Sequence, residues 1–259
     1  MKVITQMNPE VRKKVILEML NNQESITIQE VVKRCDVSEI TIRRDFDELE
    51  SKGLMIRTHG GAVKSKAGDQ LFMYDLKINQ NRTNKEAICE VASQFIKNDD
   101  IIFIDCGTTL IHLTKFIPKL DSLIVITNSL PVVSELINFP TIKLILLGGE
   151  AVNERKAIYG PFAERSISQY HANKAFIGAD GVSIKKGLSS FDEKEAAITL
   201  RMAENADEVF LLCDSSKIEK NSFVKFASLS SINYLITDKE VDKKYISEYK
   251  AHNVKIITE

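Results

Sequence analysis

The sequence predicts an α/β protein with two domains, the second of them a Rossmann-like domain with a mostly parallel β-sheet. Residues 83–259 alternate continuous apolar strands with helical patterns, which is typical of a parallel sheet covered on both faces. Residues 1–63 instead combine short helical patterns with one β-hairpin pattern. The polar stretch between them, residues 64–82, has no clear period, and we interpret it as a linker. A chain of 259 residues can hold a core in each domain.

The overall composition is that of an ordinary globular protein. Hydrophobic residues make up 44% of the chain and charged residues 27%, and the formal net charge is −1. The first 66 residues carry a small excess of basic residues, whereas the remainder carries a small acidic excess. Attraction to a polyanion would therefore have to come from locally placed Arg and Lys side chains and not from the net charge.

Cysteine usage and hydropathy predict a soluble, cytoplasmic protein without a metal or another cofactor. The four cysteines form no C-x-x-C pair and have no histidine at ligand spacing, which favours free, buried thiols in a reducing compartment. They are Cys35, Cys89, Cys106 and Cys213. No secretory signal pattern and no apolar run of membrane-spanning length is present, so we expect no contact with a membrane.

The N-terminal region predicts three short helices. Asn8-Pro9 is a typical helix start, and a second helix capped by Thr27 runs through Arg34. Residues 35–37 form a turn short enough for a helix-turn-helix, and the third helix begins after Ser38. The apolar stripe expected on the first helix consists of Val11, Val15, Met19 and Leu20.

The third helix has two unlike faces. Ile42, Phe46 and Leu49 fall on one face at i, i+4 and i+7 and predict its buried side. The opposite face carries Ile40, Arg43, Arg44 and Asp47. Arginine can bind guanine O6 and N7 with two hydrogen bonds, and an apolar side chain can contact a thymine methyl group, so this face suits the major groove of DNA. An ordinary amphipathic surface helix with a solvated basic pair is the alternative.

A β-hairpin pattern follows this helix. Two extended runs, residues 54–58 and 62–64, flank the sequence His59-Gly60-Gly61. A hairpin directly after a recognition helix is the wing of a winged helix-turn-helix, and we predict that fold for residues 1–63. On a wing, Arg57 and His59 approach the phosphate backbone or the minor groove; elsewhere they are ordinary solvated side chains.

The head also resembles a known family. The run from Val37 to Phe46, together with Leu49-Glu50, Gly53 and the run from Arg57 to Ala62, closely resembles the DeoR family of bacterial transcriptional regulators. The resemblance covers about residues 12–63. It implies that double-stranded operator DNA is contacted by Ser38, Thr41, Arg43 and Arg44.

The second domain begins with a capping-box pattern and continues as alternating strands and helices. Thr83 and Glu86 have the spacing of a capping box at a helix start. The strand-like runs are residues 101–104, 123–127, 143–147, 174–178, 208–213, 233–237 and 253–257. Parallel sheets bind ligands at the carboxyl ends of their strands.

Glycines and polar residues follow the first five of these strands. They are Asp105, Gly107, Thr108 and Thr109 after the first, Thr127 and Asn128 at the end of the second, Gly148 and Gly149 after the third, Asp180 after the fourth and Lys217 after the fifth. Glycine lets a backbone approach a ligand, and a helix start after the Thr pair favours an anion. Each loop alone is most often just a turn. Together they predict a site for a phosphorylated polyol, with carboxylates on the hydroxyl groups and with Lys217 and the Thr pair on the phosphate.

These loops resemble the sensor domain of the same family over essentially the whole body. The motifs are Asp105-x-Gly-Thr-Thr, Thr127-Asn128-Ser129, Gly148-Gly149, Gly178-Ala179-Asp180-Gly181, Glu195-Ala196 and Asp214-Ser215-Ser216-Lys217. That sensor domain is similar to ribose-5-phosphate isomerase. The resemblance implies a phosphosugar effector at the strand ends, with Glu195 as a contact borne by a helix. Cys106 stands where the family more often has a small residue such as Ala or Ser, and we interpret it as a buried, inert thiol.

The leading hypothesis is a regulator that represses a sugar-catabolic operon and whose effector shifts the population of DNA-competent molecules. A two-fold operator needs two heads, so we expect a homodimer or homotetramer. The first alternative is an enzyme similar to sugar-phosphate isomerases, in which Glu193, Glu195 or Asp180 moves protons. The second is a regulator whose body only oligomerises. The complete winged helix favours a regulator over an enzyme.

Overall fold

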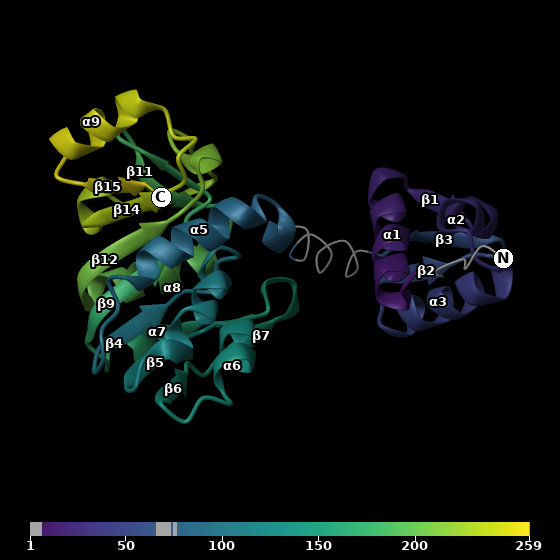
Figure 1. Cartoon of the computed structure of the whole chain (residues 1–259), viewed down its shortest axis with the longest axis horizontal. Helices are drawn as coiled ribbons and strands as arrows, with labels where there is room; N and C mark the ends of the chain where they lie inside the picture. The colour runs from purple at the N-terminus through teal and green to yellow at the C-terminus, as the bar shows by residue number, and fades with distance from the viewer. Residues whose placement is uncertain (1–6, 66–73, 75–76, 259) are drawn as a thin grey trace. The chain divides into compact units, whose positions relative to one another are not determined.

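The computed structural model describes residues 7–65, residue 74 and residues 77–258. The chain divides into two compact units, residues 1–77 and 78–259, which we call the head and the body (Figure 1). The apolar residues of the expected linker, Leu71, Phe72 and Met73, lie outside the described residues. No described helix is both long and apolar enough to cross a membrane.

The head consists of three helices and a three-stranded antiparallel sheet. Its elements in chain order are α1 (Pro9–Asn22), β1 (Ser25–Thr27), α2 (Ile28–Cys35), α3 (Glu39–Ser51), β2 (Met55–Arg57) and β3 (Gly61–Lys64). Strand β3 lies between β1 and β2 and pairs antiparallel with both. The predicted winged helix-turn-helix is confirmed, with β2 and β3 as the wing.

The core of the head fixes which face of α3 remains outside. Ile42, Phe46 and Leu49 are at most 2% exposed, as their spacing predicted. The stripe expected on α1 is wrong at Val11, which is 51% exposed. The reason is that α1 turns Arg12 toward α3, where it pairs with a buried carboxylate, and this rotates Val11 into solvent.

Seven strands form the sheet of the body, and all its neighbouring strands are parallel. The strand order is β15-β14-β12-β9-β4-β5-β6. These strands are β4 (Ile101–Ile104), β5 (Leu123–Thr127), β6 (Ile142–Leu146), β9 (Ala172–Ile177), β12 (Ala206–Leu212), β14 (Tyr234–Thr237) and β15 (Lys255–Thr258). The predicted parallel sheet is therefore confirmed.

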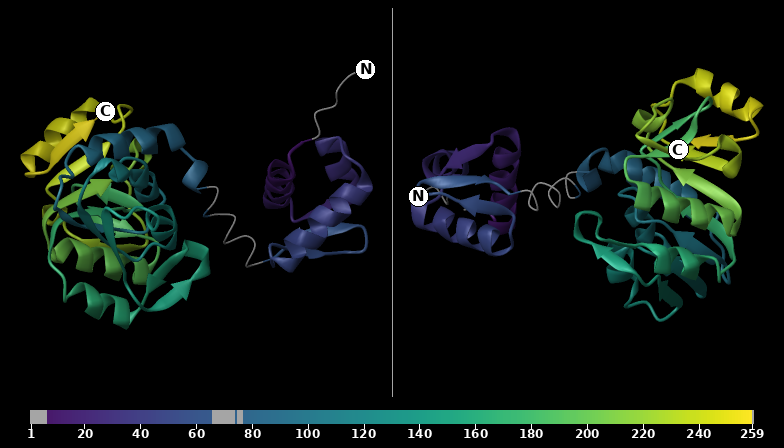
Figure 2. Two further views of the ribbon diagram at one scale, coloured as in Figure 1. Left: turned by 60° about the horizontal axis from the view of Figure 1, so that its bottom comes forward. Right: turned by 180° about the vertical axis from the view of Figure 1, so that it is seen from behind.

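Helices cover both faces of this sheet (Figures 1 and 2). One face packs against α5 (Arg82–Ser93), α6 (Leu130–Leu136) and the 3-10 helices η1 (Leu110–Lys115) and η2 (Ile117–Lys119). The other packs against α7 (Pro161–Ile167), α8 (Glu193–Glu204) and α9 (Lys243–Ala251). Successive strand residues point to opposite faces, so Ile102 and Ile104 enter the first layer and Phe103 enters the second. Burial on both faces explains why these strands are continuously apolar.

Small antiparallel elements that the sequence pattern did not reveal are inserted after the carboxyl ends of three strands. After β6 comes the hairpin of β7 (Glu150–Val152) and β8 (Ala157–Tyr159), joined by η3 (Asn153–Arg155). After β9 and β12 come β10 (Gly181–Ser183), β11 (Gly187–Ser190) and β13 (Val224–Ala227), which pair as a second small sheet. The remaining short helices are η4 (Ser215–Lys217) and η5 (Leu229–Ser231).

The start of the body differs from the expected one. Helix α5 begins at Arg82 after Asn81, which adopts a left-handed conformation and makes no side-chain cap. The capping box expected at Thr83 is therefore wrong. Its acidic partner, Glu86, accepts hydrogen bonds at 2.6 Å from Arg82 and from Lys115 instead of capping the helix.

Candidate functional site

The first turn of α3 presents small polar groups and one large apolar side chain to solvent. The Ser38 hydroxyl caps the helix by accepting the Thr41 backbone N–H at 3.3 Å, and it lies 2.9 Å from the Thr41 hydroxyl. Ile40 is 68% exposed on the same turn. An exposed isoleucine is unfavourable in water, and its place at the start of a recognition helix suits contact with base edges.

The two arginines of α3 are both exposed, but their surroundings differ. Arg43 donates from Nε and Nη2 to Glu39 Oε1, at 3.0 and 2.6 Å. Arg44 makes no ion pair with any residue in the described part of the chain. Arg44 therefore keeps all its donors for a ligand, whereas Arg43 is held by an acidic residue one turn earlier.

One buried ion pair and one partly exposed ion pair connect the recognition helix to α1. Asp45 on α3 accepts hydrogen bonds from Arg12 Nε and, at 3.0 Å, from Arg12 Nη2, and both residues are 5% exposed. Lys13 donates to Glu48 Oε1 at 2.7 Å. Burial of charged groups costs desolvation free energy, but these contacts fix the rotation of α3 about its axis. They therefore also fix the outward direction of its arginines.

The wing holds one predicted DNA contact close to α3 and exposes the other at its tip. Arg57 is half-buried on β2, where its side chain pairs with Asp47 and its backbone N–H donates to Glu50 Oε1 at 3.0 Å. His59 is exposed at the tip between β2 and β3. The wing is packed tightly at Gly61, because a side chain there would overlap the carbonyl group of Ile26 on β1.

In the body, Asp105 connects two strand ends with a helix. It is 1% exposed at the end of β4, and its Oδ1 accepts the Cys106 N–H at 2.7 Å. Its Oδ2 accepts the Gly178 N–H at 3.3 Å and the Thr199 hydroxyl of α8 at 3.1 Å. Burial raises the pKa of Asp105, while these hydrogen bonds act in the opposite direction. Both carboxylate oxygens of Asp105 thus accept hydrogen bonds from groups of the protein itself.

Glu195 and Arg155 form an ion pair at the start of α8. Arg155 Nη2 lies 3.3 Å from Glu195 Oε2, and their side chains are 24% and 16% exposed. Burial raises the pKa of Glu195 to about 7; Arg155 lowers it, and the carboxylates of Asp105, Asp180 and Asp192 raise it further. Glu195 Oε2 accepts no hydrogen bond from the described residues, because its contact with Arg155 is an ion pair only. A buried acceptor of this kind is suited to a ligand that brings a donor.

Asn128 offers a second unsatisfied acceptor. Its Nδ2 donates to the Ile158 carbonyl at 3.2 Å, whereas its buried Oδ1 has no hydrogen-bond partner among the described residues. Cys106 lies nearby, with its Sγ 3.1 Å from the Tyr159 hydroxyl, and burial raises its pKa well above the ordinary value. A thiol in this state is a poor nucleophile, as expected. All four cysteines are free and buried.

The first turns of α5 bridge the ends of β12 and β4. Asn81 Nδ2 donates to Asp214 Oδ1 at 3.3 Å, and Lys85 Nζ donates to the Thr108 hydroxyl at 3.2 Å. Lys85 is only 5% exposed. Its position in the sequence gave no sign of burial, since it belongs to a pattern interpreted as a capping box at a helix start. Lys217, on η4 after β12, is half-buried and makes no ion pair with a described residue.

Several other predicted site residues serve the fold. Thr127 donates its hydroxyl to the Ile104 carbonyl at 2.6 Å and is fully buried. Thr109 precedes η1, so the helix expected after the Thr pair is present as a 3-10 helix of six residues. A side chain on Gly149 would overlap the Tyr159 carbonyl group, whereas one on Gly148 would meet open space.

The predicted residues thus fall into two groups. Contacts and electrostatic interactions connect Asp105, Asn128, Asp180 and Glu195 through Cys106, Gly178 and Arg155. Gly107 also lies against Gly178. Thr108 and Lys217 lie at the ends of β4 and β12, which are separated in the sheet by β9. Arg155, Lys85 and Asn81 complete the arrangement, and sequence reasoning missed all three.

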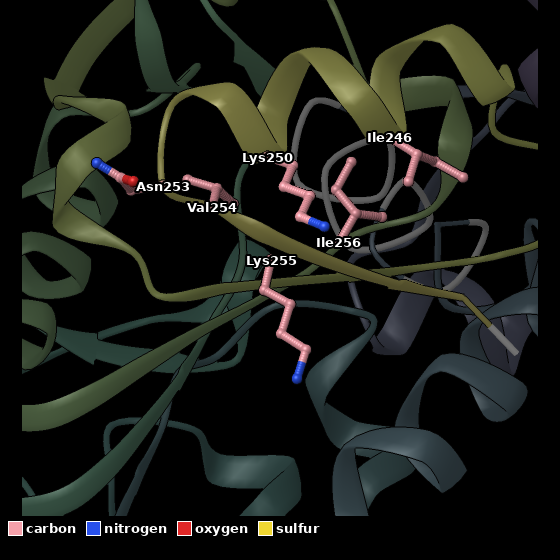
Figure 3. A pocket seen from close by; sticks show the side chains of 6 residues that line it. All are labelled: Ile246, Lys250, Asn253, Val254, Lys255 and Ile256. Atoms are coloured by element: carbon pink, nitrogen blue, oxygen red, sulfur yellow. The ribbon is translucent and has the colours of Figure 1, made fainter.

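A separate pocket of about 520 Å³ lies between α9 and β15 (Figure 3). It is lined by Ile246, Lys250, Asn253, Val254, Lys255 and Ile256. Asn253 and Val254 precede β15, so this pocket is at the amino end of an edge strand and contains none of the predicted effector residues. Among the described residues, no group of three or more His, Cys, Asp or Glu side chains is arranged to hold a metal ion.

Two family models match the chain, one for each unit. Residues 12–67 match the DeoR-like helix-turn-helix domain, and residues 80–239 match the DeoR C terminal sensor domain. Among solved structures, ribose 5-phosphate isomerase A from Methanocaldococcus jannaschii is 20% identical, with a TM-score of 0.38 over 53% of this chain and 55% of that one.

Curated relatives are similar over nearly the whole length. The lactose phosphotransferase system repressor of Lactococcus lactis is 36% identical over 95% of this chain and 97% of its own. An uncharacterized HTH-type transcriptional regulator of Bacillus subtilis is 34% identical over 95% of both chains. The L-fucose operon activator of Haemophilus influenzae is 30% identical over 94% of this chain and 97% of its own. The chain therefore belongs to the DeoR family of HTH-type transcriptional regulators.

Proposed function

We propose that the protein is a sequence-specific DNA-binding repressor of a sugar-catabolic operon, controlled by a phosphorylated sugar bound at the strand ends of the body. Two observations carry the proposal: Arg44 is exposed on the recognition helix and makes no ion pair with a described residue, and the body has buried acceptors that accept no hydrogen bond from the described residues. The names of two relatives, a lactose-system repressor and an L-fucose operon activator, support a sugar operon. Because one represses and one activates, the direction of control needs its own test.

The chemistry of the body supports a ligand with hydroxyl groups at one end and an anion at the other. Asn128 Oδ1 accepts no hydrogen bond from the described residues and Glu195 Oε2 has only its ion pair with Arg155, so both could accept from sugar hydroxyls, which are donors. Lys85 and Lys217 flank this group at the ends of β4 and β12 and supply positive charge for a phosphate. The phosphate would lie away from the carboxylates of Asp105, Asp180 and Glu195, which would repel it.

A binding screen with the full chain tests the effector. Thermal shift is measured with a panel of pentose and hexose phosphates, with the parent sugars and with inorganic phosphate. We expect a phosphosugar to stabilise the body more than either of its parts. Lys217→Ala should weaken that binding about 10- to 100-fold, the worth of a hydrogen bond to a charged group, whereas Lys225→Ala, at an exposed lysine of β13, should not. Equal shifts with parent sugars would show that the phosphate is not recognised.

The output is tested with DNA selected by the protein itself from a random duplex library. We expect one enriched sequence with two related half-sites, since a homodimer or homotetramer would present paired heads. Addition of the effector should release this DNA if the protein represses and is induced. Tighter binding with the effector would reverse the proposed direction of control.

An isomerase-like activity has one observation in its favour. A carboxyl group whose pKa is about 7, such as Glu195, is suited to general-base catalysis. The curated relatives named above are regulators, which favours a ligand-binding role for this residue. Incubation of the chain with the phosphosugars that bind, followed by product analysis, decides the matter, because measurable turnover would contradict a purely regulatory body.

A further inference from the structure

The two arginines of the recognition helix are not equivalent, and Glu39 is the reason. Glu39 precedes Arg43 by one helical turn, and a single carboxylate oxygen, Oε1, accepts from both Nε and Nη2 of Arg43. The two side chains are about half exposed, at 56% for Glu39 and 47% for Arg43. Arg44 has no such partner among the described residues.

This arrangement restricts what Arg43 can offer to DNA. A guanidinium group has five N–H donors, and Glu39 occupies the edge formed by Nε and Nη2. The edge that remains, formed by Nη1 and the second hydrogen of Nη2, still has the two parallel donors that guanine O6 and N7 require. The carboxylate therefore leaves Arg43 able to bind a guanine while fixing the direction of its free edge.

The same carboxylate disfavours the competing contact with the DNA backbone. An exposed ion pair adds little to the stability of the free protein. Near DNA, however, the negative charge of Glu39 repels phosphate groups, which would otherwise attract a free arginine on any sequence. Specificity often depends on such an unfavourable term against the wrong partner.

We propose that Glu39 is a specificity-determining residue that acts by positioning Arg43: it holds the guanidinium toward a base edge and keeps it from a sequence-independent grip on phosphate. The inference rests on the proposed DNA-binding function. Glu39 itself need not touch DNA. The two arginines of this helix face therefore differ in function: Glu39 fixes the orientation of the Arg43 side chain, whereas the Arg44 side chain can change its orientation to fit the DNA.

Selection from random duplexes with the full chain tests this role, comparing wild type with Glu39→Gln and with Glu18→Gln as a control. Glu18 is exposed on α1, so its substitution removes the same charge from a different helix. We expect Glu39→Gln to bind random DNA more tightly, with a salt slope steeper by about one phosphate contact. It should also lose about tenfold in preference at one base pair of each half-site. In an Arg43→Ala background the Glu39 substitution should change that preference no further.

The outcomes separate the inference from the function beneath it. If wild type enriches no sequence, the proposed function fails, and the role of Glu39 fails with it. If wild type enriches a sequence and Glu39→Gln keeps every base preference, changing random-DNA affinity no more than Glu18→Gln does, only the inference is overturned. Thermal unfolding of the full chain with Glu39→Gln should match wild type, because the pair is exposed. A lower melting temperature together with unchanged preferences would mean that the pair only supports the helix, which also contradicts the inference.

Discussion

The buried carboxyl group of Glu195 should make the stability of the body depend on pH. Its side chain is 16% exposed and borders the carboxylates of Asp105, Asp180 and Asp192, with Arg155 as its only ion-pair partner among the described residues. Burial is the largest cause that raises its pKa from 4.5 to about 7. In the unfolded chain the group returns to its ordinary value, so folding takes up a proton between these two pH values.

The sign and size of the effect follow from this proton. Between pH 4.5 and about 7 the folded state holds the proton and the unfolded state does not, so the free energy of unfolding falls as pH rises. At about 1.4 kcal/mol for each pH unit, the group would contribute about 3 kcal/mol that is fully present below pH 4.5 and lost above pH 7. This loss is a large fraction of the free energy of unfolding of a typical domain, which is roughly 5–15 kcal/mol.

Denaturant unfolding of the body at a series of pH values measures this contribution. Wild type is compared at each pH with Glu195→Gln, because other groups, among them His112, whose pKa burial lowers, also make stability depend on pH. The advantage of wild type over the variant should shrink by about 3 kcal/mol from pH 4.5 to pH 7.5. Glu193→Gln, at an exposed neighbour, should show no such trend. A difference between wild type and Glu195→Gln that stays constant, or grows with pH, would refute the reasoning.

Three further substitutions test the head. Asp45→Asn leaves the buried guanidinium of Arg12 without its counter-charge, and we expect a loss of about 3 to 5 kcal/mol in chemical unfolding; a loss under 1 kcal/mol would show that the pair is solvated. Gly61→Ala should destabilise the head by about 1 to 3 kcal/mol, because the added methyl group overlaps the backbone of β1. Gly60→Ala meets open space and is the matched control, so equal melting temperatures would contradict the wing packing. Arg44→Ala should weaken binding to the selected operator by about 1 to 3 kcal/mol in a titration, and an equal loss on random DNA would assign it to phosphate instead.

Local patterns predicted the elements whose cause is local. The recognition helix is an example, because Ser38 caps it, Gly53 follows it with a φ of 70°, and the spacing of Ile42 and Phe46 selects its buried face. The parallel sheet is another, since burial on both faces leaves a continuous apolar run in each strand. The helix is determined by residues close to one another in the sequence, and each strand is determined by having the same buried environment on both faces.

Elements whose cause is tertiary were not predictable. The rotation of α1 depends on the pairing of Arg12 with Asp45, 33 residues later, so periodicity placed Val11 inside when it lies outside. The small sheet of β10, β11 and β13 has strands of three or four residues, and β13 comes from a part of the chain distant from β10 and β11. Strands this short have too few residues to establish an alternation, and only pairing with their partners makes them extended.

The list of predicted effector residues mixed two kinds of polar group that a sequence cannot separate. Asp105 and Thr127 follow strands as a ligand-binding residue would, yet the structure uses their side chains to hold neighbouring backbone and side-chain groups. Asn128 and Glu195 retain buried acceptor atoms without hydrogen bonds from described residues. Asp105 and Asn128, one of each kind, both come directly after a strand, so only their tertiary partners distinguish them. Breaking the hydrogen bonds of a buried polar group that already has partners costs free energy, so a ligand should be bound by Asn128 and Glu195 and not by Asp105 and Thr127. Removal of Asp105 or Thr127 should still abolish ligand binding, but it would do so by changing the shape of the loops.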